Sequence, residues 1–229
     1  MFDPIRPPNA TPPEARKATS RNAAQWEATP TLPGTHYVDT RVYTDAGIFE
    51  EEIEKIWKKV WLPICHESEL AEPLDYRTSA IAGGTPIVIV RGSDHRIRAF
   101  FNICAHRGNM IVRSPAGNLG KAEPSGNPKH MTCMYHGFQF DYRGRCVEIP
   151  REKAGYQDRL CKADLGLREI KTEVAYGGIV WLNLDDDCEP LADFVAGAFD
   201  FMKQELDTEP LDIFHYQKSM FRINYKQWH

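Results

Sequence analysis

The sequence has no long hydrophobic run, and this absence excludes a membrane-spanning helix. Its longest purely aliphatic stretch covers residues 87–90, whereas a spanning helix requires roughly 18 consecutive apolar residues. Residues 1–8 contain no apolar core of the kind that a secretory signal needs. We therefore expect a cytoplasmic protein, in which thiols stay reduced.

The chain also lacks a strong excess of charge of one sign. Its 28 Lys and Arg residues nearly balance its 32 Asp and Glu residues, and the formal net charge is −4. Nucleic acids and anionic membranes favour a strongly basic surface, so neither partner is expected. Hydrophobic residues make up 42% of the 229 residues, a share that is typical of a folded chain.

Cysteine is too scarce for a disulfide scaffold. The chain has six cysteines and eight histidines, and in a reducing compartment such residues point first to metal ligation.

The middle of the chain alternates short β-branched and aromatic runs with Gly, Pro and Asp, which predicts a small antiparallel β domain. Helical stripes at residues 48–60 and 191–206 flank it. The fold class is therefore mainly β with flanking helices. The expected strands cover residues 76–82, 86–91, 96–102, 138–142, 145–148, 165–174 and 179–184.

The two ends of the chain differ from this middle part. Seven of the 16 prolines fall within residues 1–35, which predicts an extended N-terminal arm over residues 1–44. Residues 221–226 alternate apolar and polar side chains, as in a half-buried strand, yet no turn follows them. We expect a β domain over residues 45–186, and residues 187–229 as the truncated beginning of a second domain.

Two short segments combine a thiol with an imidazole. Cys104 and His106 have Cys-x-His spacing, and Cys133 and His136 have Cys-x-x-His spacing. Each pair is followed by a glycine, which lets the backbone turn and direct N–H groups at sulfur. Both pairs lie at the ends of expected strands, where two hairpin tips can meet.

Two metal centres fit this ligand set. Two Cys and two His can hold a tetrahedral zinc ion, or a [2Fe–2S] cluster in which two His replace two Cys on one iron. Zinc sites usually pair like ligands within one segment, whereas each segment here is mixed. The mixed segments favour the cluster, because each one can give its cysteine to one iron and its histidine to the other.

The motifs resemble the N-terminal Rieske domain of the large (alpha) subunit of Rieske non-haem iron oxygenases. The matching residues are Cys-x-His-Arg-Gly at 104–108 and Cys-x-Tyr-His-Gly-Phe at 133–138, and the likeness runs from about residue 48 to the Asn-Tyr-Lys segment at 224–226. It implies a Rieske-type antiparallel β domain followed by the start of an α+β catalytic domain.

The resemblance also implies the cofactors and their ligands. Cys104 and Cys133 would hold the inner iron of a [2Fe–2S] cluster, and His106 and His136 the outer one. No catalytic residue is expected in this fragment, because the ligands of the mononuclear non-haem Fe(II) would lie beyond His229.

Respiratory and photosynthetic Rieske subunits fit the sequence less well. They carry an extra cysteine in each segment, and hydroxyl groups that donate hydrogen bonds to cluster sulfurs. Here Phe138 and Phe140 stand where those hydroxyls would be. With fewer hydrogen bonds to sulfur the reduced cluster is less stable, so we expect a low reduction potential.

The spacing between the two segments points to a substrate class. The 26 residues between His106 and Cys133 exceed the spacing of most family members, and the surplus at residues 114–129 is expected to be a surface excursion. This spacing resembles the family members that hydroxylate small alkanesulfonates such as methanesulfonate, releasing an aldehyde and sulfite. The alternatives are an aromatic-ring-hydroxylating dioxygenase subunit and a stand-alone Rieske electron carrier.

The family resemblance further implies protein partners. These are a ferredoxin, an NADH-dependent reductase, a small (beta) subunit and other copies of the chain in a trimer-based oligomer.

We expect minor roles for the other residues that the sequence singles out. Arg107, Tyr135 and Trp61 are expected to shape the surroundings of the cluster. The remaining cysteines and histidines form no second ligand pair at useful spacing, and a small apolar core role is expected for each cysteine. These residues are His66, His95, His130, His215, His229, Cys65, Cys146, Cys161 and Cys188.

Overall fold

The computed structural model describes residues 41–121, 130–217, 219 and 221–227. The chain divides into two compact units, residues 52–220 and a smaller unit of residues 1–51 with 221–229. In the smaller unit α1 (Arg41–Thr44) leads into α2 (Ala46–Glu52), and the Asp45 carboxylate accepts hydrogen bonds from the first free N–H groups of α2. The rest of the expected arm, residues 1–40, lies outside the described residues.

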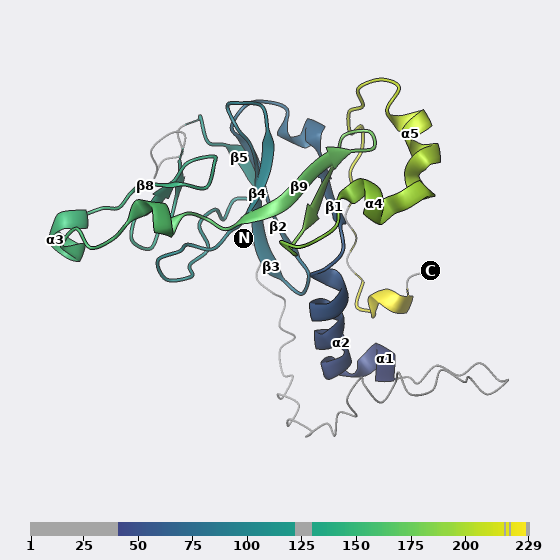
Figure 1. Ribbon diagram of the computed structural model, residues 1–229, viewed down its shortest axis with the longest axis horizontal. Helices are drawn as coiled ribbons and strands as arrows, with labels where there is room; N and C mark the ends of the chain where they lie inside the picture. The colour runs from purple at the N-terminus through teal and green to yellow at the C-terminus, as the bar shows by residue number, and fades with distance from the viewer. Residues whose placement is uncertain (1–40, 122–129, 218, 220, 228–229) are drawn as a thin grey trace. The chain divides into compact units, whose positions relative to one another are not determined.

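An antiparallel seven-stranded sheet forms the centre of the larger unit (Figure 1). It confirms a mainly antiparallel β fold, and it contains the hairpins expected from the turn residues. In the order in which they pair, its strands are β1 (Leu62–His66), β10 (Ile179–Asn183), β9 (Glu169–Ala175), β4 (Ile97–Phe101), β3 (Thr85–Arg91), β2 (Asp75–Ile81) and β5 (Ala116–Asn118).

A second sheet of three short strands carries the later Cys and His segment. Its strands are β6 (Met131–Thr132), β7 (Gln139–Phe140) and β8 (Cys146–Glu148), all antiparallel. Gly144, with φ +74°, turns the chain between β7 and β8, as the Arg-Gly pair predicts. In Figure 1 the labels β8 and α3 (Glu152–Tyr156) lie at one end of this unit, away from α4 and α5.

Strand β3 separates two hydrophobic clusters, because successive side chains of a strand point to opposite faces. Val88 and Val90 face a cluster that also contains Cys104 and Cys133. Ile87 and Ile89 face a second cluster, between the sheet and Leu70. The aliphatic run in the sequence is therefore a strand buried on both faces, and one face supports the metal-ligand segments.

The helices are short. They comprise a π-helical turn (Ile53–Trp57), α3, α4 (Leu191–Val195), α5 (Asp200–Leu206) and 3-10 turns at Glu67–Leu70, Lys162–Leu165, Ala196–Phe199 and Tyr225–Gln227. The expected helix over residues 191–206 is broken, because Ala196 adopts a positive φ of 44° next to Gly197. Among the described residues, none of the helices has the length and apolarity to span a membrane.

Two local expectations need correction. Residues 114–129 are not wholly a surface excursion, since Ala116–Asn118 pairs with β2 and Leu119 is buried beside the cysteine-containing cluster. Residues 122–129 lie outside the described residues. The expected strand over 221–226 is absent from the described residues, because the Asn224 side chain accepts a hydrogen bond from the Lys226 N–H and favours a 3-10 turn.

Candidate metal centre

The two Cys and His segments adopt the same backbone turn. In the first loop (residues 104–109) the Cys104 N–H donates to the Asn109 carbonyl at 2.8 Å, and the Gly108 N–H donates to the Cys104 carbonyl at 2.9 Å. In the second loop (residues 133–138) the corresponding bonds, Cys133 to Phe138 and Gly137 to Cys133, both measure 2.8 Å. The loops are therefore structural equivalents, each closed by its own backbone.

Glycine makes these turns accessible. Gly108 and Gly137 have φ values of +70° and +76°, which residues other than glycine rarely adopt. The first loop begins three residues after the last residue of β4, and the second connects β6 to β7. The expectation that the segments lie at strand ends is confirmed.

The two loops bring like side chains together. The Cys104 and Cys133 thiols are neighbours, since Cys133 is one of the groups that raise the pKa of Cys104, and both cysteines are 2% exposed. The ring centroids of His106 and His136 are 4.7 Å apart, and both residues are half-buried. The four predicted ligands thus form an inner sulfur pair and an outer imidazole pair.

This grouping fits a two-iron cluster better than a zinc ion. A tetrahedral zinc site needs four ligands around one ion, whereas each iron of a Rieske cluster takes two protein ligands. The separate sulfur and imidazole pairs match the second requirement.

Burial shifts the pKa values of Cys104 and His106, and neighbouring groups modify these shifts. Burial raises the pKa of the Cys104 thiol to about 11, although the backbone N–H groups of His106 and Arg107 oppose this shift. Those N–H groups stabilise the thiolate, which is the form that binds metal. Burial, His136 and Arg107 together lower the pKa of His106, and this favours the neutral imidazole that a metal ligand must be.

Aromatic rings surround His106. The Phe138 ring stacks on it with centroids 4.6 Å apart and an interplanar angle of 4°. Tyr156 meets the His106 ring edge-on, and its hydroxyl lies 3.5 Å from Nε2. On the other side of the site, Tyr135 packs against His136 at 3.8 Å, and the Arg107 guanidinium lies 5.4 Å from the Tyr135 ring centroid.

Three residues of the site were missed by sequence reasoning: Asn102, Asn109 and Tyr156. Asn102 is 1% exposed; its amide nitrogen donates to the Val112 carbonyl at 2.7 Å, and its oxygen accepts from the N–H groups of Ile111 and Val112. The Asn109 amide reaches the sulfur of Cys133. Asn102 and Asn109 flank the first motif, but nothing in their spacing indicates these contacts, and Tyr156 lies far along the chain.

The residues expected to surround the cluster, and the cysteines outside the two loops, do not all lie where the sequence predicts. Arg107 and Tyr135 lie at the site, whereas Trp61 belongs to a separate hydrophobic cluster with Trp181 and Leu191. Cys146 is buried as expected, but Cys161 is exposed, because it precedes a surface 3-10 turn, and has no core role.

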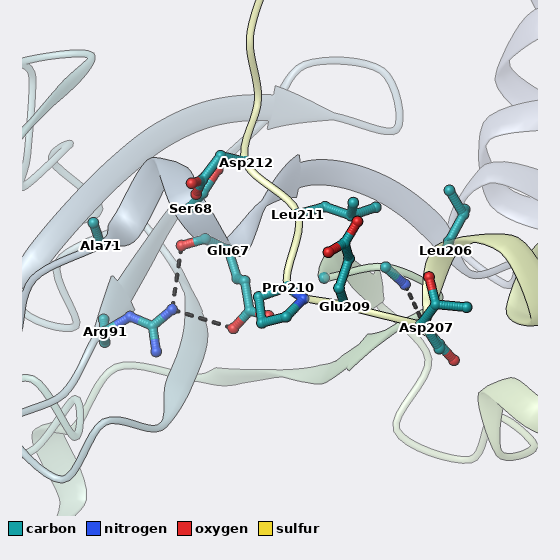
Figure 2. Close-up of a pocket in the computed structure, with 13 residues that line it drawn as sticks. Glu67, Ser68, Ala71, Arg91, Leu206, Asp207, Glu209, Pro210, Leu211 and Asp212 are labelled. Carbon is teal, nitrogen blue, oxygen red and sulfur yellow. Dashed lines mark hydrogen bonds and ion pairs between the residues drawn. The ribbon is translucent and has the colours of Figure 1, made fainter.

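A cavity of about 550 Å³ lies elsewhere in the larger unit, between Glu67 and the segment 206–212 (Figure 2). Several of its labelled side chains are acidic. Its one arginine, Arg91, already donates to Glu67 and to the Leu70 and His95 carbonyls. The cavity contains none of the predicted ligands, so the candidate centre is the pair of loops.

Comparison with protein families identifies the domain that these loops belong to. The family model described as the Rieske [2Fe-2S] domain matches residues 60–171, which include both loops. Residues 60–171 therefore belong to the Rieske [2Fe-2S] domain family. The expected fold and cofactor class are confirmed.

Curated relatives extend this likeness over nearly the whole chain. The alpha subunit of the methanesulfonate monooxygenase hydroxylase from Methylosulfonomonas methylovora is 52% identical over 210 residues, which cover 92% of this chain and 50% of the relative. The alpha subunit of 2-aminobenzenesulfonate 2,3-dioxygenase from Alcaligenes sp is 40% identical over 210 residues, 91% of this chain and 50% of the relative. The chain spans about half the length of these relatives, and it corresponds to the N-terminal half of a Rieske oxygenase alpha subunit.

Solved structures show the same likeness in their folds. A naphthalene 1,2-dioxygenase mutant bound to phenanthrene superposes with a TM-score of 0.62 at 33% identity, over 70% of this chain and 34% of the other. The apo form of a quaternary ammonium Rieske monooxygenase gives a TM-score of 0.64 at 31% identity, over 73% of this chain and 45% of the other. The fold class and the recognition of an oxygenase alpha subunit thus stand on both sequence and structure.

Proposed function

We propose that Cys104 and Cys133 ligate one iron of a [2Fe–2S] cluster, and that His106 and His136 ligate the other. The pairing of buried thiols and half-buried imidazoles across two equivalent loops is the observation that carries this assignment. When bound, such a cluster supplies one-electron transfer. Its redox chemistry would then lie closest to the surface on the histidine side.

The residues around this site shield its sulfur side from water and leave its histidine side exposed. The cysteines sit in the hydrophobic cluster with Phe138 and Phe140, which excludes water from the sulfur side. On the histidine side, Met134 and Tyr135 are 66% and 54% exposed. Exposed apolar side chains next to a ligand pair offer a dry contact surface for a redox partner.

The function that these features support is electron transfer within an oxygenase alpha subunit. A ferredoxin, itself reduced by an NADH-dependent reductase, would deliver electrons to the histidine side. The mononuclear non-haem Fe(II) and its catalytic residues would belong to the part of the subunit outside this chain, with residues 187–229 as the beginning of that domain. A quaternary ammonium Rieske monooxygenase has been described with inter-subunit electron transfer, which favours an assembly of several copies of the subunit here. The family resemblance implies that this assembly is trimer-based and contains beta subunits.

The substrate that fits best is a small organic sulfonate, first of all methanesulfonate. Two curated relatives named for sulfonate substrates are 52% and 40% identical to the chain. In the overall reaction methanesulfonate, O₂, NADH and a proton would give hydroxymethanesulfonate, NAD⁺ and water. The hydroxymethanesulfonate would then break its carbon–sulfur bond to release formaldehyde and hydrogensulfite.

The test uses the complete alpha subunit with its beta subunit, ferredoxin and reductase. We expect methanesulfonate to drive NADH oxidation and to release sulfite in equal amount, while benzoate drives neither. Turnover of benzoate or 2-aminobenzenesulfonate to a ring diol without methanesulfonate turnover would replace this substrate by an aromatic one. Reduction of the protein without oxidation of any of these substrates would favour a stand-alone electron carrier.

A further inference from the structure

The sixth residue of the first loop, Asn109, reaches across to the second loop. Its side-chain nitrogen Nδ2 lies 3.6 Å from the Cys133 sulfur Sγ and 2.8 Å from the Met110 carbonyl oxygen. The backbone carbonyl of Asn109 meanwhile accepts the N–H of Cys104. One residue therefore contacts both cysteine positions, one through its backbone and the other through its side chain.

The orientation of the Asn109 amide follows from its partners. The Met110 carbonyl can only accept a hydrogen bond, so the amide group must present its nitrogen to that oxygen. An amide nitrogen carries two N–H groups. The second one is free to point at Sγ, and a donor-to-sulfur distance of 3.6 Å suits such a bond.

We propose that Asn109 is a positioning residue that raises the reduction potential of the centre by donating a hydrogen bond to the sulfur of Cys133. This inference rests on the proposed assignment of Cys133 as an iron ligand. Reduction adds negative charge, part of which resides on the ligand sulfurs, and a donor aimed at sulfur stabilises the more negative state. The bond also ties the two loops together.

This contact revises the potential expected from sequence. Phe138 and Phe140 have no hydroxyl to offer the cluster, but they are not the whole polar environment of the sulfurs. Cys104 receives backbone N–H groups from its own loop, whereas Cys133 receives a side-chain N–H from the opposite loop. The side-chain donor is set by one residue, so the potential can be tuned by substitution there.

Two variants of the complete alpha subunit separate tuning from loop structure. Asn109→Leu keeps a similar volume and removes the donor. Asn109→Asp keeps the shape and replaces the N–H₂ group by an acceptor oxygen. The matched control is Asn118→Leu, because Asn118 is also half-buried and its Nδ2 also makes two bonds, to the Pro73 carbonyl and the Asp75 carboxylate.

The measurements are iron and sulfide content, the midpoint potential by redox titration of the visible circular dichroism, and the iron–sulfur stretching bands in resonance Raman spectra. We expect Asn109→Leu to make reduction about tenfold less favourable, which for a one-electron couple is a fall of about 59 mV. Asn109→Asp should fall further, the bands involving Cys133 should shift in both variants, and Asn118→Leu should match the wild type.

Each outcome decides a different claim. Unchanged potentials and bands in cluster-containing Asn109 variants, or an equal fall in Asn118→Leu, would overturn the role of Asn109 and leave the ligand assignment intact. A wild-type protein without iron and sulfide would instead overturn the proposed function, and the inference with it. Loss of the cluster in both Asn109 variants would make the residue structural and would also overturn the tuning role.

Discussion

The two loops proposed to hold the cluster have the same backbone hydrogen bonds but make different contacts with each other. Each closes with the same pair of hydrogen bonds, and in each the sixth residue reaches a proposed ligand of the other loop. In the first loop that residue is Asn109, which approaches the Cys133 sulfur. In the second it is Phe138, which stacks on the His106 ring. A symmetric frame therefore supports an asymmetric environment, polar at one cysteine and aromatic at one histidine.

The largest effect expected within this comparison is loss of a ligand from either loop. Replacing Cys104 or Cys133 by Ser should abolish the cluster, because a serine hydroxyl does not replace the buried thiolate as an iron ligand. Cys146→Ser is the matched control, since Cys146 is buried in the same hydrophobic cluster. Iron and sulfide analysis with visible absorption measures the outcome, and a normal cluster in either loop variant would remove that cysteine from the ligand set.

Alanine substitution should destabilise the two loop glycines to different extents, although their backbone conformations are alike. A Cβ on Gly108 would have no atom within 4 Å, so only the positive φ opposes Gly108→Ala, at about 1 kcal/mol. A Cβ on Gly137 would lie 2.8 Å from the Pro150 ring, and such overpacking adds about 1–3 kcal/mol. We expect Gly137→Ala to lose the visible cluster absorption at clearly lower urea than Gly108→Ala. Equal urea midpoints would mean that Pro150 does not constrain the second loop.

A substitution at Asp94, which lies in a charged turn outside the two loops, should affect the stability of the fold without affecting the reduction potential. Asp94 accepts two hydrogen bonds from Arg98 and lies 3.3 Å from an Arg143 nitrogen, and the hydrogen bond with Arg98 is the main cause that holds the pKa of Asp94 well below its usual range. A lowered folded-state pKa stabilises the fold at pH above the unfolded value of 3.8, and this stabilisation disappears as the pH falls below it.

Asp94→Asn should therefore lower the free energy of unfolding at pH 7 by at most about 1 kcal/mol, because the pair is partly exposed. The difference from wild type should shrink below pH 4, where the Asp94 carboxylate of the unfolded wild-type chain takes up a proton while that of the folded chain is still charged. Urea unfolding followed by tryptophan fluorescence checks both points. A difference that grows toward low pH would reverse the assigned sign.

The smallest effect is expected at the histidine of the first loop. The Tyr156 hydroxyl lies 3.5 Å from His106 Nε2, and an acceptor for that N–H makes the imidazole a stronger electron donor. Tyr156→Phe should therefore make reduction about threefold more favourable, the direction opposite to that expected for Asn109→Leu. Tyr135→Phe, whose ring contact with His136 is retained, should leave the potential unchanged. A fall of the potential in Tyr156→Phe would contradict this assignment.

The parts of the structure that follow local rules were predictable from sequence. Glycine after each Cys and His pair indicated the turns, and the aliphatic run at residues 87–90 indicated a buried strand. Longer elements failed where a single residue changed the backbone. Ala196 broke the expected helix, and the Asn224 side chain replaced the expected strand at residues 221–226 by a short turn.

The asymmetry of the site was not predictable for a different reason. The contact of Asn109 with Cys133 joins residues 24 positions apart, and Tyr156 approaches His106 from 50 positions away. Such contacts depend on how the two sheets pack, not on a spacing that a motif records. The four proposed ligands could be predicted because their chemistry and spacing are local to each segment.

The most direct test of the account is the number of histidine nitrogens coupled to the reduced centre. The complete alpha subunit would be prepared with ¹⁵N-labelled histidine, reduced, and examined by pulsed electron paramagnetic resonance. We predict strong coupling to two histidine nitrogens, with one coupling lost in His106→Cys and the other in His136→Cys. A colourless protein that binds zinc, or a reduced iron–sulfur signal without histidine coupling, would contradict the assignment of the two loops as a Rieske centre.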